Sequence, residues 1–109
     1  IVRGTTSRRI VTMLKEAGAT EVHVRIASPP MTDPCFYGVD TSTREELISA
    51  RKDTAGVCEE IGADSLVFLS PGSLLKAGNR KELCMACFTG QYPTALYQSP
   101  EEANKDVKC

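Results

Sequence analysis

The spacing of apolar residues changes from a helical to a strand period within the first quarter of the chain. Residues 8–17 carry apolar side chains three or four positions apart, which places them on one face of a helix. Gly18 suits the position just after the end of that helix. Residues 22–26 then alternate between apolar and polar or small side chains, as in a strand with one buried face. The helical set is Ile10, Met13, Leu14 and Ala17, and the strand set is Val22, Val24 and Ile26.

The residues before this helix complete a recurring unit. Ile1 and Val2 are typical of the end of a strand, and residues 3–7 form a short polar turn. The order is therefore strand end, polar loop, helix and strand, which is most of a βαβ unit. Such a unit implies neighbouring parallel strands, so the sequence predicts an α/β fold.

The middle of the chain begins with a loop. Pro29, Pro30 and Pro34 interrupt regular structure, and we expect residues 34–38 to form a loop whose aromatic side chains are buried. Thr43 and Glu46 have the spacing of a capping box. They predict a helix that continues through residues 48–51.

Three further elements are predicted downstream. Asp53 or Thr54 can cap a short helix that Gly62 terminates. Residues 66–69 form a brief apolar run, typical of a buried strand. Ser70 and Pro71 suit the N-cap and first turn of a helix through residue 75.

Composition limits the function classes. The chain has 109 residues, which allows one small domain, and its formal net charge is −1. This charge gives no broad attraction to nucleic acid or to anionic membranes. No apolar run approaches the roughly 18 residues of a membrane span, and no signal-peptide pattern is present. Any bound anion must therefore be held by a local group of hydrogen-bond donors or positive charges. Because the sequence starts at Ile1 without methionine, we expect it to be a piece of a longer protein.

The polar loop Arg3-Gly4-Thr5-Thr6-Ser7 is a candidate for such a local anion-binding site. The first turn of a helix offers free N–H groups and the positive end of the helix dipole, so a phosphate is well placed there. Gly4 allows the backbone to approach an anion, the hydroxyl groups add donors, and Arg3 adds charge. One of the hydroxyl side chains is also expected to cap the helix. Taken alone, the string favours an ordinary turn and N-cap, because short loops of glycine and threonine are common.

The five cysteines suggest a second site. They are Cys35, Cys58, Cys84, Cys87 and Cys109. An odd count without a secretory signal argues against a disulfide framework and favours a reduced, cytoplasmic protein with metal ligands. Cys84 and Cys87 form a C-x-x-C pair, which by itself is compatible with a zinc half-site, a redox pair or coincidence. Cys35 is a possible third ligand. We expect Cys58 to be a buried structural thiol, Cys109 to be free, and His23 to be an ordinary surface side chain.

Three strings together resemble the amidophosphoribosyltransferases of the iron–sulfur type. The string from Ile1 to Ser7 is similar to the phosphoribosyl-pyrophosphate (PRPP) motif of type I phosphoribosyltransferases. The strings 34–40 and 82–90 are similar to two cluster-binding segments of that family. The three occur in the family's order, and the resemblance covers residues 1–94.

The resemblance implies a specific set of roles. Residues Arg3, Gly4, Thr5, Thr6 and Ser7 would hold the 5-phosphate of PRPP, and no catalytic residue is assigned. Two acidic residues expected immediately before Ile1 would hold the ribose hydroxyls and support Mg²⁺. Cys35, Cys84 and Cys87 would bind a [4Fe–4S] cluster, whose fourth ligand would lie outside this chain. A small, non-enzymatic zinc module built on the same three cysteines is the alternative.

The implied parent enzyme transfers glutamine-derived ammonia to PRPP, the first committed step of purine (IMP) biosynthesis. The chain would be a carboxyl-terminal fragment of it, inactive alone. We expect residues 1–70 to be part of a Rossmann-like phosphoribosyltransferase domain, residues 71–97 a helical cluster-binding segment, and residues 98–109 a tail. The resemblance further implies feedback by purine nucleotides, a homo-oligomer at full length, and a cytoplasmic location without nucleic-acid or membrane partners.

Overall fold

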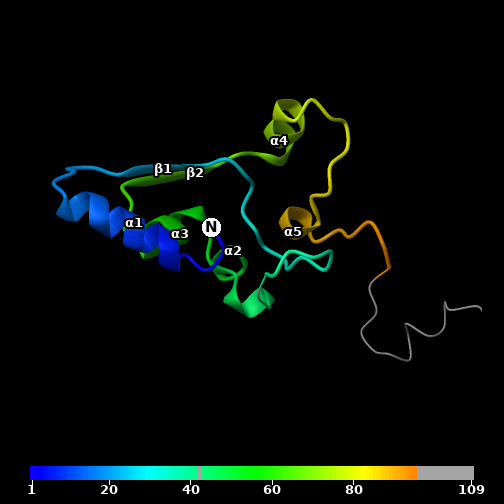
Figure 1. The fold of residues 1–109 in the computed structure, drawn as a ribbon, viewed down its shortest axis with the longest axis horizontal. Coiled ribbons are helices and arrows are strands. Elements are labelled where there is room, and N and C mark those ends of the chain that lie inside the picture. Colours follow the sequence, from blue (N-terminus) through cyan, green and yellow to red (C-terminus); the bar gives the residue numbers. More distant parts are fainter. Residues whose placement is uncertain (42, 96–109) are drawn as a thin grey trace, which may run out of the picture.

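A computed structural model describes residues 1–41 and 43–95 of the chain. The first part of the fold is a two-stranded parallel sheet with helices α1 and α3 on one side of it (Figure 1). The remaining helices follow along the chain, and α4 and α5 lie beyond the end of the sheet (Figure 1). The elements are α1 (Thr5–Glu16), β1 (His23–Ile26), the 3₁₀ helix η1 (Arg44–Glu46), α2 (Ile48–Arg51), α3 (Thr54–Ile61), β2 (Ser65–Phe68), α4 (Pro71–Ala77) and α5 (Ala86–Thr89).

The parallel sheet confirms the α/β prediction. β1 and β2 pair in register from His23 opposite Ser65 to Ile26 opposite Phe68. Asp64 fixes the start of this register, because its carboxylate accepts the Val22 N–H at 2.7 Å. The Asp64 N–H in turn donates to the Val22 carbonyl at 2.9 Å. The two strands are therefore aligned by a reciprocal pair of bonds just before they begin.

A small apolar core lies between the sheet and α3. Its buried members are Ile48, Val57, Ile61 and Leu66. Strand residues Val24, Ile26 and Phe68 pack against these side chains from the sheet, and Ile1 packs against them from the start of the chain. The predicted strand face is thus confirmed, and the core connects the two ends of the βαβ unit.

Several predicted helix ends are confirmed by their capping geometry. The Asp53 carboxylate accepts the Gly56 N–H at 2.8 Å and begins α3, and Gly62 ends it with a left-handed φ of 74°. The Ser70 hydroxyl accepts the Ser73 N–H at 3.1 Å and begins α4. These caps satisfy backbone groups that a helix end leaves without intrahelical partners.

The predicted capping box of Thr43 and Glu46 is wrong. Residues 44–46 form a separate 3₁₀ helix, Leu47 is extended, and α2 begins only at Ile48. No side-chain hydrogen bond from Thr43 caps η1. The Glu46 carboxylate instead accepts hydrogen bonds from Arg3, 43 residues earlier, so a tertiary ion pair replaces the local contact that the spacing suggested.

The apolar face predicted for α1 is not buried. Val11 packs inward against the fold, whereas Ile10, Met13 and Leu14 are 53%, 61% and 47% exposed. Within the described residues, β1 pairs only with β2, so its outer edge beside α1 has no partner strand. The helix forms as the periodicity predicts, but the described residues include no element that covers its apolar stripe.

The aromatic residues predicted to be buried after Pro34 are also exposed, since Phe36 and Tyr37 retain 59% and 44% of their surface. Among the described residues, no helix is both long enough and apolar enough to cross a membrane. The predicted tail, residues 98–109, lies outside the described residues, as do residues 96 and 97 of the predicted cluster-binding segment.

Candidate functional site

The polar loop enters α1 through a glycine in a left-handed conformation. Gly4 is buried, has a φ of 85° and occupies the N-cap position of α1. Its carbonyl accepts the Arg8 N–H at 2.9 Å, which closes the first helical turn. The seven residues from Ile1 to Ser7 line an open depression of about 450 Å³. The loop predicted from sequence therefore lines a concave surface at a helix N-terminus.

The first turn of α1 keeps its donors available. No side chain caps this helix, so the prediction that one of the loop hydroxyls would do so is wrong. Thr5, Thr6 and Ser7 are instead the first three helical residues, and the two threonines are exposed. The first turn contains no acidic residue that would offset the positive end of the helix dipole. Backbone N–H groups, hydroxyl groups and the dipole thus favour an anion at the same place.

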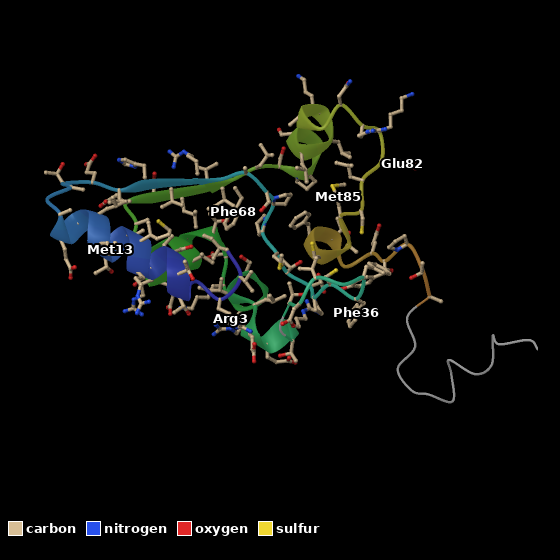
Figure 2. The ribbon with its side chains drawn as sticks, viewed as in Figure 1. Arg3, Met13, Phe36, Phe68, Glu82 and Met85 are labelled. Carbon is tan, nitrogen blue, oxygen red and sulfur yellow. The ribbon has the colours of Figure 1, made fainter. Side chains whose placement is uncertain are left out.

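The Arg3 side chain forms an ion pair with Glu46 of η1. Its Nη2 and Nε atoms lie 3.0 and 3.2 Å from Oε2 of Glu46, and Figure 2 shows Arg3 close to the helices that follow residue 43. Both side chains are more than half exposed, so solvent weakens this attraction. The pair fixes the guanidinium beside the loop and ties the loop to η1.

Gly4 also meets the apolar core. A Cβ atom added to Gly4 would lie 3.0 Å from Cδ1 of Ile48 and 3.7 Å from Cγ2 of Ile61. A side chain at this position would therefore point into the core. The glycine is required by the packing beneath the loop as well as by its left-handed backbone.

The three candidate metal ligands come from two segments that lie against each other. Cys35 lies in the loop after β1, Cys84 lies just before α5, and Cys87 lies within α5. The backbone N–H groups of Thr32 and Asp33 both donate to the Cys87 carbonyl, at 3.0 and 3.1 Å. The Cys35 loop is thereby hydrogen-bonded to the helix that carries the C-x-x-C pair.

The surroundings of the Cys87 thiol disfavour its charged form. Burial raises the pKa of the Cys87 thiol, and the nearby thiols of Cys35 and Cys84 and the carboxylate of Asp33 raise it further. A hydrogen bond with its own backbone opposes these effects.

The described residues do not gather ligands around a single ion. Within the part of the chain that the structure describes, no three cysteine, histidine or acidic side chains are placed to hold one metal ion. Zinc needs four ligands at about 2.0–2.3 Å from one centre, so the zinc-module alternative is not supported. The Cys35 sulfur accepts a hydrogen bond from the Tyr37 N–H at 3.4 Å.

The other two cysteines are not part of this group. Cys58 is half-buried in α3, packs against the core and donates its S–H to the Ala63 carbonyl at 3.3 Å, as expected for a structural thiol. Cys109 lies outside the described residues. His23 is exposed and hydrogen-bonds Ser65 and Glu21, which confirms that it is a surface residue.

Sequence reasoning missed Tyr92. Its hydroxyl donates to the Pro34 carbonyl at 2.6 Å, directly before Cys35, and its ring lies 5.2 Å from that of Phe36. Burial raises the pKa of the Tyr92 hydroxyl, and the acidic groups of Asp33, Cys87 and Cys35 add to the shift. Its position five residues after the C-x-x-C pair was the only available signal, and that spacing has no meaning without the fold.

Known proteins resemble this chain over most of its length. It is 62% identical over 104 residues to an amidophosphoribosyltransferase from Bacillus subtilis, which covers 90% of this chain and 22% of the relative. It is 50% identical over 107 residues to one from Synechococcus elongatus, covering 96% of this chain and 21% of the relative. No protein-family profile matches the chain.

A solved structure agrees with these sequence relatives. The fold superimposes with a TM-score of 0.84 on a glutamine PRPP amidotransferase from B. subtilis that was complexed with ADP and GMP. The match has 62% identity and covers 90% of this chain and 23% of the solved one. Sequence and fold agree, and the chain therefore belongs to the amidophosphoribosyltransferase family, spanning about a fifth of the length of the relatives it matches.

Proposed function

We propose that this chain is the carboxyl-terminal part of an enzyme that makes 5-phosphoribosylamine from PRPP and ammonia released from glutamine. The relatives carry the name of that activity, and the similar solved structure is a PRPP amidotransferase. In this reaction ammonia forms a bond to the anomeric carbon, the bond from that carbon to pyrophosphate breaks, and a proton is released. The step is the first committed one of purine biosynthesis.

The loop from Arg3 to Ser7 supplies the site for the 5-phosphate. The observation that carries this assignment is the uncapped first turn of α1, entered through left-handed Gly4 and opening onto the depression. Phosphoribosyl transfer depends mainly on holding the phosphate, the ribose and the pyrophosphate in place while positive charge develops on the sugar. Arg3, Gly4, Thr5, Thr6 and Ser7 perform the first of these tasks. We assign no catalytic residue to this chain, and the Mg²⁺ ligands lie upstream.

Cys35, Cys84 and Cys87 supply three ligands of a metal centre, and a thiol from outside the chain supplies the fourth. Two observations support this assignment: the backbone of the Cys35 loop is hydrogen-bonded to the Cys87 carbonyl, and Cys35 and Cys84 contribute to the raised pKa of the Cys87 thiol. When bound, a [4Fe–4S] cluster would act as a covalent staple between the Cys35 loop, the α5 segment and a distant part of the enzyme. The free state of Cys35, Cys58, Cys84 and Cys87 is consistent with a reducing, cytoplasmic location.

The same assignment divides the described part of the chain into two segments. Residues 1–70 are part of the phosphoribosyltransferase domain, and the cluster-binding segment begins at residue 71. The ADP and GMP bound to the B. subtilis relative support purine nucleotides as feedback inhibitors of the complete enzyme. We further assign the complete enzyme as a homo-oligomer that binds neither nucleic acid nor membrane.

The phosphate loop is tested by two threonines on the same helix. Thr6 lies in the first turn of α1, whereas the Thr12 hydroxyl donates to the Arg8 carbonyl further along it. In the complete enzyme, Thr6→Ala should weaken PRPP binding about 10- to 100-fold, the range for a lost hydrogen bond to a charged group. Thr12→Ala should leave the affinity unchanged. Calorimetric titration with Mg²⁺–PRPP measures both, and equal affinities for the two variants would reject the loop as the phosphate site.

A further inference from the structure

An aromatic clasp holds the Cys35 loop against the α5 segment. We define it as Phe36 and Tyr37 in the loop together with Tyr92 and Thr94 after α5. The Tyr37 hydroxyl lies 2.8 Å from Oγ1 of Thr94 and also accepts the Thr94 N–H at 3.3 Å. The centroid of the Tyr92 ring lies 5.2 Å from that of Phe36 and 6.2 Å from that of Tyr37, so Tyr92 contacts both loop aromatics. The contacts join residues more than 50 positions apart in the sequence.

The Tyr92 hydroxyl acts at the backbone next to the candidate ligand. It donates to the Pro34 carbonyl at 2.6 Å, and Pro34 immediately precedes Cys35. On the other side, the Cys35 N–H donates to Oγ1 of Thr41 at 2.7 Å. The backbone that carries Cys35 is therefore held from both sides, by Tyr92 across the fold and by Thr41 within the loop.

The clasp and the Cys87 carbonyl hold the loop at two points. Thr32 and Asp33 donate to that carbonyl at one end of the loop, and Tyr92 and Thr94 hold residues 34–37 at the other. Figure 2 shows Phe36 in this loop next to the α5 segment. Most of these bonds are made by backbone groups and aromatic side chains, so they form without any metal.

We propose that Tyr92 is a positioning residue that orders the Cys35 loop in the metal-free protein, so that the backbone that carries Cys35 is held beside the Cys87 helix before any metal binds. A loop ordered in advance loses less conformational entropy when its ligand arrives, which raises affinity. The clasp itself stands on the described contacts. Its consequence for metal binding rests on the metal centre proposed above.

The order of the loop is tested in the metal-free chain with Tyr92→Phe, which removes one hydroxyl and keeps the ring. Hydrogen exchange measured by mass spectrometry should be about two- to tenfold faster for residues 31–41, since one intramolecular hydrogen bond is lost. Alkylation of the Cys35 thiol should accelerate by a similar factor. Exchange of the core residues 57–61 should not change, which separates a local effect from general destabilisation. Gln91→Ala, an exposed neighbour, is the matched control.

Two results would overturn this inference. One is exchange and alkylation in Tyr92→Phe that match those of Gln91→Ala. The other is exchange of residues 31–41 in the unmodified chain as fast as in an unstructured peptide while residues 57–61 remain protected.

The metal consequence is measured separately, by anaerobic reconstitution with ferrous iron and sulfide followed by iron analysis. In the complete enzyme, which includes the fourth ligand, Tyr92→Phe should retain less iron than the unmodified enzyme after exposure to a chelator, and equal retention would overturn the link between clasp and metal. If the unmodified complete enzyme binds no iron while the loop is protected, the proposed metal centre fails and the clasp stands.

Discussion

Replacing Gly4 by alanine should destabilise the chain through two separable effects. Gly4 has a φ of 85°, a left-handed conformation that costs an L-residue with a Cβ about 1–2 kcal/mol. The added Cβ would also lie 3.0 Å from Cδ1 of Ile48, a member of the buried core. Overpacking of a core costs typically about 1–3 kcal/mol. The sum is about 2–5 kcal/mol, a large part of the roughly 5–15 kcal/mol that stabilises an ordinary domain.

Gly18 provides the matched control. Its φ of 107° is also positive, but a Cβ there would meet no atom within 4 Å. Gly18→Ala therefore carries the backbone cost alone and should lose about 1–2 kcal/mol. Urea unfolding followed by far-ultraviolet circular dichroism measures the free energy of unfolding of both variants.

A second substitution isolates the contact with the core. Ile48→Val removes the Cδ1 atom that the new Cβ would meet and alone should cost about 0.5–1.5 kcal/mol. In the Gly4→Ala background it should cost less, with a coupling of at least about 0.5 kcal/mol. If Gly4→Ala is no more harmful than Gly18→Ala and shows no coupling to Ile48, then the packing argument for Gly4 is incorrect.

Three further predictions concern other parts of the fold. The hydrogen bond from the Val22 N–H is the main cause of the lowered pKa of the Asp64 carboxyl. Asp64 therefore contributes stability that is present above its unfolded pKa and is lost as pH falls through its folded pKa. Asp64→Asn should flatten the decline in urea midpoint between neutral and acidic pH, and an unchanged decline would contradict this role. Asp53→Ala removes the N-cap of α3 and should lower the free energy of unfolding by about 1 kcal/mol in the same urea assay, whereas no loss would show that the bond to Gly56 contributes nothing. Cys87→Ser should abolish iron retention after anaerobic reconstitution of the complete enzyme, while Cys58→Ser should preserve it; the opposite pattern would assign the wrong thiols.

Local sequence signals predicted the elements well where a single side chain decides the structure. The caps by Asp53 and Ser70 and the C-terminal glycines at 18 and 62 need only neighbouring backbone groups. The alternation at residues 22–26 predicted β1 for a comparable reason, since the period of a strand is fixed by its geometry. Each of these features is complete within a few residues of sequence.

The failures occur where distant residues compete for the same group. Glu46 had the spacing of a capping box, but Arg3 offers a charged partner that local reasoning cannot place. Gly4 was expected to serve an anion, and only the fold shows that Ile48 lies beneath it. Tyr92 and Pro34 are brought together by tertiary structure, so no short motif connects them. The prediction that the loop and the cysteines belong to one enzyme came from family motifs, because such motifs carry long-range information that local spacing lacks.

The outer edge of β1 has a practical consequence for handling the purified polypeptide. The backbone groups at this edge lack a partner strand among the described residues. Nearby, the apolar side chains of Ile10, Met13 and Leu14 of α1 are exposed. Such an edge is a template for adding a strand from another molecule. The exposed side chain of Arg25 places positive charge on this strand, and like-charge repulsion between copies weakens when salt screens it. Concentrated, salty stocks should therefore form aggregates sooner than dilute, low-salt ones.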